Sequence, residues 1–107
     1  MDIPVKVKQI ADILADKKGQ DIKIIYVADK TIVSDYFVIA SASSSTLVVT
    51  LADELEAKTA EAGFPPLRIE GVREGRWAVL DFGDVLVHIF HNEERVHFPE
   101  YYSIQCD

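Results

Sequence analysis

Apolar residues near the start of the chain follow the spacing of a helix. They recur at intervals of three and four residues, as on one helix face: Val7, Ile10, Ala11 and Leu14. Pro4 suits the first helical turn, and Gly19 follows two lysines in the way typical of a left-handed helix stop. The pattern predicts a helix from about Pro4 to Lys18.

The next segments carry the patterns of strands. Residues 22–27 are rich in β-branched side chains, residues 28–30 can form a turn, and residues 36–40 are a continuous apolar run. A run that is apolar at every position is typical of a strand buried on both faces of a sheet. We therefore expect a central strand at 36–40.

A second helix and a short edge strand come next. Residues 41–46 are polar and rich in side chains that cap a helix. Apolar residues then mark one helix face: Leu47, Val48, Leu51, Ala52 and Leu55. Gly63 ends this helix and two prolines prevent its continuation, so residues 67–70 fit a short edge strand.

The pattern of residues 77–90 predicts a β-hairpin. Two apolar segments flank Gly83-Asp84, and glycine at the first central position is what a type II′ turn requires. Because this turn sets the register, six apolar residues share one face: Ala78, Leu80, Phe82, Val85, Val87 and Ile89. That face should belong to the core.

The opposite face of the hairpin is mixed. It holds six residues, which we call the docking residues: Trp77, Val79, Asp81, Leu86, His88 and Phe90. An isolated soluble domain has no reason to display two large aromatic side chains, so we expect this face to bind a partner. Tryptophan is strongly enriched in interface hot spots, and Trp77 is therefore interpreted as an interface residue rather than a core residue.

The length of 107 residues and an apolar content of 49% fit one globular domain, residues 1–107. We expect an α/β (α+β) fold, with a mixed five-stranded sheet and helices packed on one face. The pattern predicts no regular structure for most of the tail, residues 92–107. A helical turn at 93–96 is compatible with it, but Pro99 interrupts any longer helix.

The chain is acidic, with eighteen acidic and eleven basic residues and a net charge of −7. Binding to nucleic acid through generic phosphate neutralisation is therefore disfavoured, and a basic protein partner is expected. The single cysteine, Cys106, allows no intrachain disulfide, which fits a reducing cytosol. The sequence has neither a signal-peptide pattern nor an apolar run long enough to span a membrane, so we expect a cytoplasmic protein.

Asp81 and Asp84 are the candidates for enzymatic chemistry. Paired carboxylates can hold the divalent metal of a nucleotidyl-transfer site, and Asp81-Phe82-Gly83 spells the metal-binding triplet of protein kinases. The sequence lacks the glycine-rich loop and strand-lysine motif of a kinase, and it lacks the Gly-Ser loop of a nucleotidyltransferase. Asp84 also falls in the hairpin turn. We expect no catalytic residues, and a Mg-dependent nucleotidyltransferase stays the less favoured alternative.

Three further groups of residues, histidines, serines and arginines, have structural explanations that are simpler than metal binding or catalysis. His88, His91 and His97 could suggest zinc, but His88 and His91 should lie on opposite faces of a strand, so we expect no metal and no cofactor. The serines of residues 41–45 lack the sequence elbow of a nucleophile, and capping explains them. The arginines of residues 68–76 alternate with Glu70 and Glu74, which favours a salt-bridged, solvated loop.

Several segments, taken in order, resemble the ribosomal silencing factors, also called Iojap-like proteins. They are KGQDI at 18–22, SDYFVIA at 34–40, Gly63 with Pro66, EG at 70–71, GRW at 75–77 and DFGDVLVHIF at 81–90. Two segments depart from the family pattern. Residues 41–46 read SASSST where the family usually has Thr-Gly-Thr-Ser and a basic pair, and the tail lacks the usual leucine-rich and tryptophan-containing helix.

The resemblance implies a fold related to the nucleotidyltransferases but without their catalytic residues. It also implies a translation repressor that binds the large ribosomal subunit through the ribosomal protein numbered fourteen and blocks joining of the small subunit when nutrients are scarce. Mitochondrial relatives assist large-subunit assembly, so an assembly factor is the alternative. The family's interface tryptophan falls on Trp77. Little direct nucleic-acid contact and no membrane association are expected, and a homodimer stays open.

Overall fold

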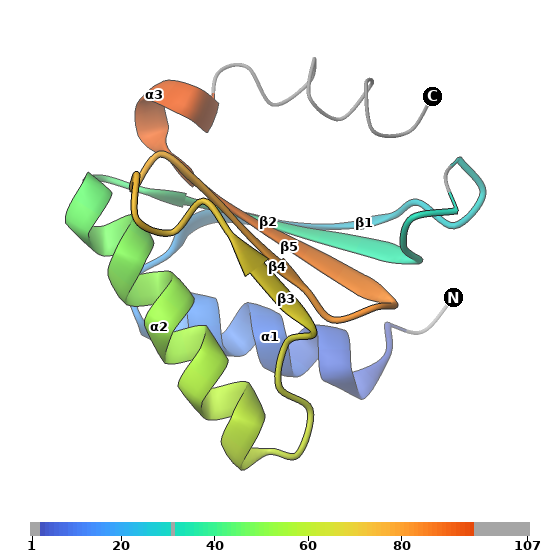
Figure 1. Cartoon of the computed structure of the whole chain (residues 1–107). Helices are drawn as coiled ribbons and strands as arrows, with labels where there is room; N and C mark the ends of the chain where they lie inside the picture. Colours follow the sequence, from blue (N-terminus) through green and yellow to red (C-terminus); the bar gives the residue numbers. More distant parts are fainter. Residues whose placement is uncertain (1–2, 31, 96–107) are drawn as a thin grey trace.

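The computed structural model describes residues 3–30 and 32–95. In chain order its elements are α1 (Val5–Asp16), β1 (Gln20–Tyr26), β2 (Tyr36–Ala42), α2 (Ser45–Glu61), β3 (Arg68–Glu70), β4 (Trp77–Asp81), β5 (Val85–His91) and α3 (Asn92–Arg95). The five strands form one sheet in the order β1-β2-β5-β4-β3 (Figure 1). β2 and β5 are parallel, and the other neighbouring strands are antiparallel.

The two long helices, α1 and α2, lie on the same face of the sheet (Figure 1). Their apolar stripes pack on the strands and close one core. Its fully buried members include Ile10, Leu14, Leu51 and Leu55 from the helices and Val38, Leu80, Val87 and Ile89 from the strands. The predicted fold class, an α+β fold with a mixed five-stranded sheet and helices on one face, is confirmed.

The end of α1 differs from the prediction. The helix stops at Asp16, and the left-handed residue is Lys18, with φ 76°, rather than Gly19. Gly19 serves another need, because its N–H donates to the Leu14 carbonyl oxygen at 2.7 Å and a Cβ at this position would lie 2.8 Å from the same oxygen. The glycine permits a close backbone approach, and the expected left-handed stop at Gly19 is wrong.

α2 begins and ends as the sequence predicts. Ser44 is the N-cap, and its hydroxyl oxygen accepts a hydrogen bond from the Leu47 N–H at 3.1 Å. Gly63 follows the helix with φ 95°, the left-handed conformation expected of a terminating glycine. Of the predicted stripe, Val48, Leu51, Ala52 and Leu55 are buried and Leu47 is partly buried, and Thr59 extends the buried face by one more turn.

The β4–β5 hairpin has the predicted register. Its cross-strand pairs are Ala78 with Ile89, Leu80 with Val87, and Phe82 with Val85 through the Phe82 N–H. Gly83 has φ 89°, the positive value that a type II′ turn requires at its first central position. All six apolar residues on this face belong to the core beneath α1 and α2.

The remaining strands form where they are predicted, with ends that differ by one or two residues: β1 covers Gln20–Tyr26 rather than 22–27, β2 continues to Ala42, and β3 begins at Arg68. β2 is buried at all seven positions between β1 and β5, as expected of a central strand. β3 is a three-residue edge strand. The expected helical turn after Asn92 is present as α3, whereas residues 96–107, with His97, Pro99 and Cys106, lie outside the described residues. Among the described residues, no helix is long and apolar enough to cross a membrane.

Candidate functional site

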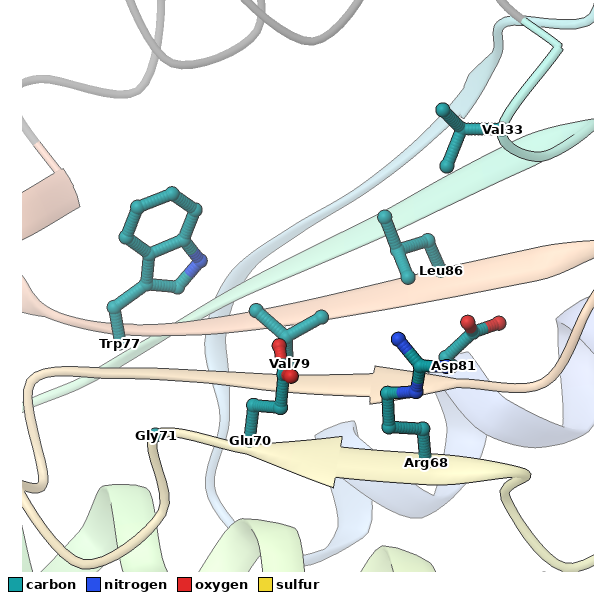
Figure 2. A pocket seen from close by; sticks show the side chains of 8 residues that line it. All are labelled: Val33, Arg68, Glu70, Gly71, Trp77, Val79, Asp81 and Leu86. Carbon is teal, nitrogen blue, oxygen red and sulfur yellow. The ribbon is translucent and has the colours of Figure 1, made fainter.

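An open groove lies on the face of the sheet opposite α1 and α2. Its volume is about 480 Å³, and we call it the Trp77 groove. Figure 2 shows side chains from β3, β4 and β5 on the same side of the sheet, with Val33 beyond Leu86. The lining residues are Val33, Arg68, Glu70, Gly71, Trp77, Val79, Asp81 and Leu86.

The structure brings four of the six docking residues to this groove: Trp77, Val79, Asp81 and Leu86. The other two, His88 and Phe90, are 2% and 0% exposed. The expectation that this face displays two large aromatic side chains is therefore wrong for Phe90. The reason is a second apolar cluster on this face, made of Val27, Phe37, Ile39, Leu86 and Phe90, with Ile25, Trp77 and Val79 packed against it.

Trp77 is half-buried, and two neighbours hold its indole. Nε1 donates a hydrogen bond to Nδ1 of His88 at 3.0 Å. The indole also stacks on Phe90, with ring centroids 5.2 Å apart and an interplanar angle of 22°. Trp77 is therefore an oriented side chain at the groove wall, and its immobilisation by a partner would lose little further rotamer entropy.

Sequence reasoning missed four lining residues: Val33, Arg68, Glu70 and Gly71. Arg68 and Glu70 lie opposite Asp81 and Val79 in the β3–β4 pair. The two-residue period of a strand would have placed them on the docking face once the β3–β4 pairing was assumed. Val33 comes from the β1–β2 loop, and no local pattern relates that loop to the hairpin.

The charged groups of the groove are two carboxylates and one guanidinium, from Glu70, Asp81 and Arg68. The carboxylate of Asp81 also shapes the hairpin, because Oδ1 accepts a hydrogen bond from the Gly83 N–H at 2.8 Å. Asp84 has a different partner, since its Oδ1 lies 2.8 Å from Nζ of Lys6 in α1. The two aspartates considered for a metal site are thus engaged with different groups.

The histidines are also separated. The His88 ring contacts those of Phe37 and Phe90, whereas Nδ1 of His91 accepts a hydrogen bond from the Glu93 N–H at 3.1 Å and so caps α3. Within residues 3–30 and 32–95, no three His, Cys, Asp or Glu side chains gather in a group that could hold a metal ion.

A comparison with protein families identifies the chain. The family described as ribosomal silencing factor during starvation matches residues 1–99. The chain belongs to the ribosomal silencing factor family. The resemblance deduced from the motifs of the sequence is confirmed.

Relatives and solved structures agree with this family. The ribosomal silencing factor RsfS of Bacillus subtilis is 36% identical over 90 residues, which are 84% of this chain and 73% of that protein. A crystal structure from Chromobacterium violaceum superposes with a TM-score of 0.83 at 30% identity, covering 92% of this chain and 82% of the other. One from Bacillus halodurans gives 0.80 at 31% identity and covers 90% of each chain.

The loop that departs from the family pattern keeps a structural role. Ser41 and Ala42 end β2, and Ser44 caps α2. Gly75 lies close to the start of this helix, since a Cβ there would lie 2.7 Å from the Cβ of Ser45. Small side chains in this loop therefore let the segment after β3 pack against α2.

α3 borders the same face and is held by two arginines. Arg76 pairs with Glu94 at 2.7 Å and with Glu93 at 3.5 Å, so the expected salt bridge of this arginine to the interleaved Glu70 or Glu74 is wrong. Arg95 donates hydrogen bonds to the Ser41 hydroxyl and to the Asp21 carbonyl oxygen. Glu94 raises the pKa of Arg76 above its ordinary value, and burial lowers the pKa of Arg95.

Proposed function

We propose that this member of the ribosomal silencing factor family represses translation by binding the large ribosomal subunit and blocking its joining with the small subunit. The family assignment supports the ribosome-associated role. The site is proposed to be the Trp77 groove, with the ribosomal protein numbered fourteen as the contact. The observation that carries this proposal is an oriented, half-buried tryptophan at the wall of an open groove.

The groove has the composition of a protein interface. Trp77, Val79, Leu86 and Val33 supply apolar surface, and the charged groups lie among them. The β1–β2 loop adds to this surface, because Ile32 is fully exposed next to Val33. Central aromatic anchors surrounded by such residues contribute most of the binding energy in typical interfaces.

The charge of the groove favours a basic partner. Two carboxylates and one guanidinium give the lining a net negative charge, in a chain whose net charge is −7. Complementary charge speeds the encounter of two proteins and disfavours partners of the same sign. A basic ribosomal protein meets this requirement better than exposed ribosomal RNA does.

The size of the domain suits a steric mechanism. Its principal extents are 34 × 32 × 22 Å. A rigid body of these dimensions, seated on the joining face of one subunit, leaves no room for the close contacts of a joined ribosome. Repression then needs occupancy of the joining face and no chemical step by this protein.

Sedimentation of ribosomes with added protein tests the proposal. We expect the protein to travel with free large subunits and to lower the fraction of joined ribosomes as its concentration rises. Trp77→Ala should weaken binding to isolated large subunits about 30- to 1000-fold, the range for an aromatic hot spot. Equal co-sedimentation with joined ribosomes would contradict the silencing mechanism.

The matched control is Tyr26→Ala. Tyr26 is 43% exposed and pairs with Tyr36 on the helix-bearing face of the sheet, so this variant also removes a partly exposed aromatic ring. It should bind large subunits within about threefold of the unmodified protein. A similar loss in both variants would show that the groove is not the contact.

A further inference from the structure

A buried histidine contacts the only tryptophan of the chain. Nδ1 of His88 lies 3.0 Å from Nε1 of Trp77, and His88 is 2% exposed. An indole N–H can only donate a hydrogen bond, so Nδ1 of His88 must accept and carries no proton. The geometry therefore requires a neutral imidazole with its proton on Nε2.

The surroundings of His88 are mostly aromatic and aliphatic. Phe37 meets the imidazole edge-on at 5.0 Å, and Phe90 lies parallel to it at 5.9 Å, both measured between ring centroids. Ile39 and Val79 are the residues opposite His88 on β2 and β4. This environment favours the uncharged form of an imidazole over the charged form.

Among residues 3–30 and 32–95, the charged groups that face His88 from the sheet are on more distant strands. Lys23 on β1 and Glu70 on β3 share its cross-sheet row, each two strands away, or about 10 Å at the usual strand spacing. The others on this face are Arg68 on β3, Asp81 on β4 and the α3 residue Arg95. The strands next to β5 thus place Ile39 and Val79, rather than a charged residue, directly opposite the imidazole.

We propose that His88 is a positioning residue for docking, whose neutral imidazole holds the Trp77 indole in its binding orientation. A proton taken up from solvent at Nδ1 places two donors against each other, so the Trp77–His88 hydrogen bond breaks. Trp77 then keeps its stacking on Phe90 but loses its polar restraint. Docking weakens as the pH falls. This inference rests on the proposed function, because it assumes that Trp77 contacts the ribosome.

The emission of the single tryptophan reports the pair without any ribosome. An imidazolium next to an indole quenches its fluorescence, so acidification from pH 8 to pH 5.5 should lower the emission in one transition. Its midpoint should lie at or below about 6.5, the ordinary titration point of histidine. His88→Asn should abolish the transition, because the amide oxygen can replace Nδ1 as an acceptor but does not titrate.

His91→Asn is the control for the other described histidine. The variant retains an acceptor for the Glu93 N–H and lies outside the docking residues. Its fluorescence transition should match that of the unmodified protein. A transition that persists in His88→Asn, or an emission that stays constant over this pH range, overturns the proposal.

Binding to isolated large subunits at pH 7.5 and pH 5.8 tests the consequence for docking. The unmodified protein should lose up to about fivefold in affinity at the lower pH, because a histidine that titrates near its ordinary value of about 6.5 is still about one-sixth neutral at pH 5.8 and only that fraction docks as before. At pH 7.5, His88→Asn should bind large subunits with an affinity within about threefold of that of the unmodified protein. At pH 5.8 it should lose only the affinity that titration of the subunits themselves removes. His88→Phe fills the space without an acceptor and should be weakened about 5- to 30-fold at both pH values.

The readouts separate this inference from the proposed function. If the fluorescence transition depends on His88 but Trp77→Ala binds large subunits normally, the groove is not the docking site and the proposal of docking control fails with it. If Trp77→Ala loses binding while His88→Phe, shown by urea melting to be folded, binds normally at both pH values, the proposed function stands and the positioning role is wrong.

Discussion

Gly71 sets how closely the chain after β3 approaches Trp77. The residue has φ 76°, and a Cβ on it would lie 2.2 Å from the Trp77 carbonyl oxygen. A side chain here would meet backbone atoms rather than a flexible side-chain end. Gly71 must therefore be a glycine for two reasons, its left-handed conformation and the missing space.

Gly71→Ala should lower the free energy of unfolding by about 2 to 5 kcal/mol, because left-handed strain adds to a steric clash. Gly63→Ala isolates the strain, since Gly63 has φ 95° but no neighbouring atom lies within 4 Å of the place a methyl group would take. That control should lose only about 1 to 2 kcal/mol. Urea melts measure the loss of unfolding free energy in both variants. Equal losses would contradict the close approach of Gly71 to the Trp77 backbone.

These glycines show which residue roles the sequence reveals. The roles of Gly63 and Gly83 are predictable, because a helix end and a two-residue hairpin are local patterns with known backbone requirements. The role of Gly19 differs from its prediction, and that of Gly71 has no local signal. Both are required by contacts with backbone that the local pattern does not locate, Leu14 for Gly19 and Trp77 for Gly71.

At the scale of elements, α3 depends on side chains rather than on its own length. It has four residues, and Arg95 ties it to β1 and β2 through Asp21 and Ser41. A single helical turn has no stability by itself in water. The hydrogen bonds of Arg95 are therefore expected to hold α3 at the end of the sheet next to Trp77 and Phe90.

Arg95→Met should release α3 while leaving the sheet folded. The amide protons of residues 92–95 should exchange about tenfold faster or more, which matches the loss of about 1.5 to 3 kcal/mol for hydrogen bonds from a charged donor. Arg73→Met, at an exposed position in the loop before β4, is the control and should leave exchange in α3 unchanged. Hydrogen exchange followed by mass spectrometry or NMR measures both. Unchanged protection in Arg95→Met would contradict this role.

The helices and strands are easier to predict than the side chains that different strands bury together on one face of the sheet. The alternation in β4 and β5 indicates the correct core face, because a II′ turn fixes the register of a hairpin. The burial of Phe90 is not predictable in the same way. It depends on β2 lying parallel to β5, which brings Phe37 and Ile39 beside the docking residues across more than forty residues of sequence.

For the whole molecule, charge should act on the rate of docking more than on the fold. Thirteen acidic residues against five basic ones lie after residue 30, where the groove also lies. On a complete subunit, RNA phosphates repel a chain of net charge −7, and this repulsion opposes attraction to a basic protein. The proposed contact, the isolated ribosomal protein numbered fourteen, is therefore the better choice for measuring the electrostatics of the groove.

Association with that isolated protein should slow by about tenfold or more between 50 and 500 mM salt, with a smaller change in dissociation, because screening shortens the reach of the charges to a few ångströms. Glu70→Gln combined with Asp81→Asn should flatten this dependence, and the asparagine can still accept the Gly83 N–H. The matched control is Glu56→Gln with Asp53→Asn, exposed on α2 behind the sheet, which changes the net charge equally. Stopped-flow measurements that show the same salt dependence in both pairs would mean that the net charge, and not the acidic lining of the Trp77 groove, steers the encounter.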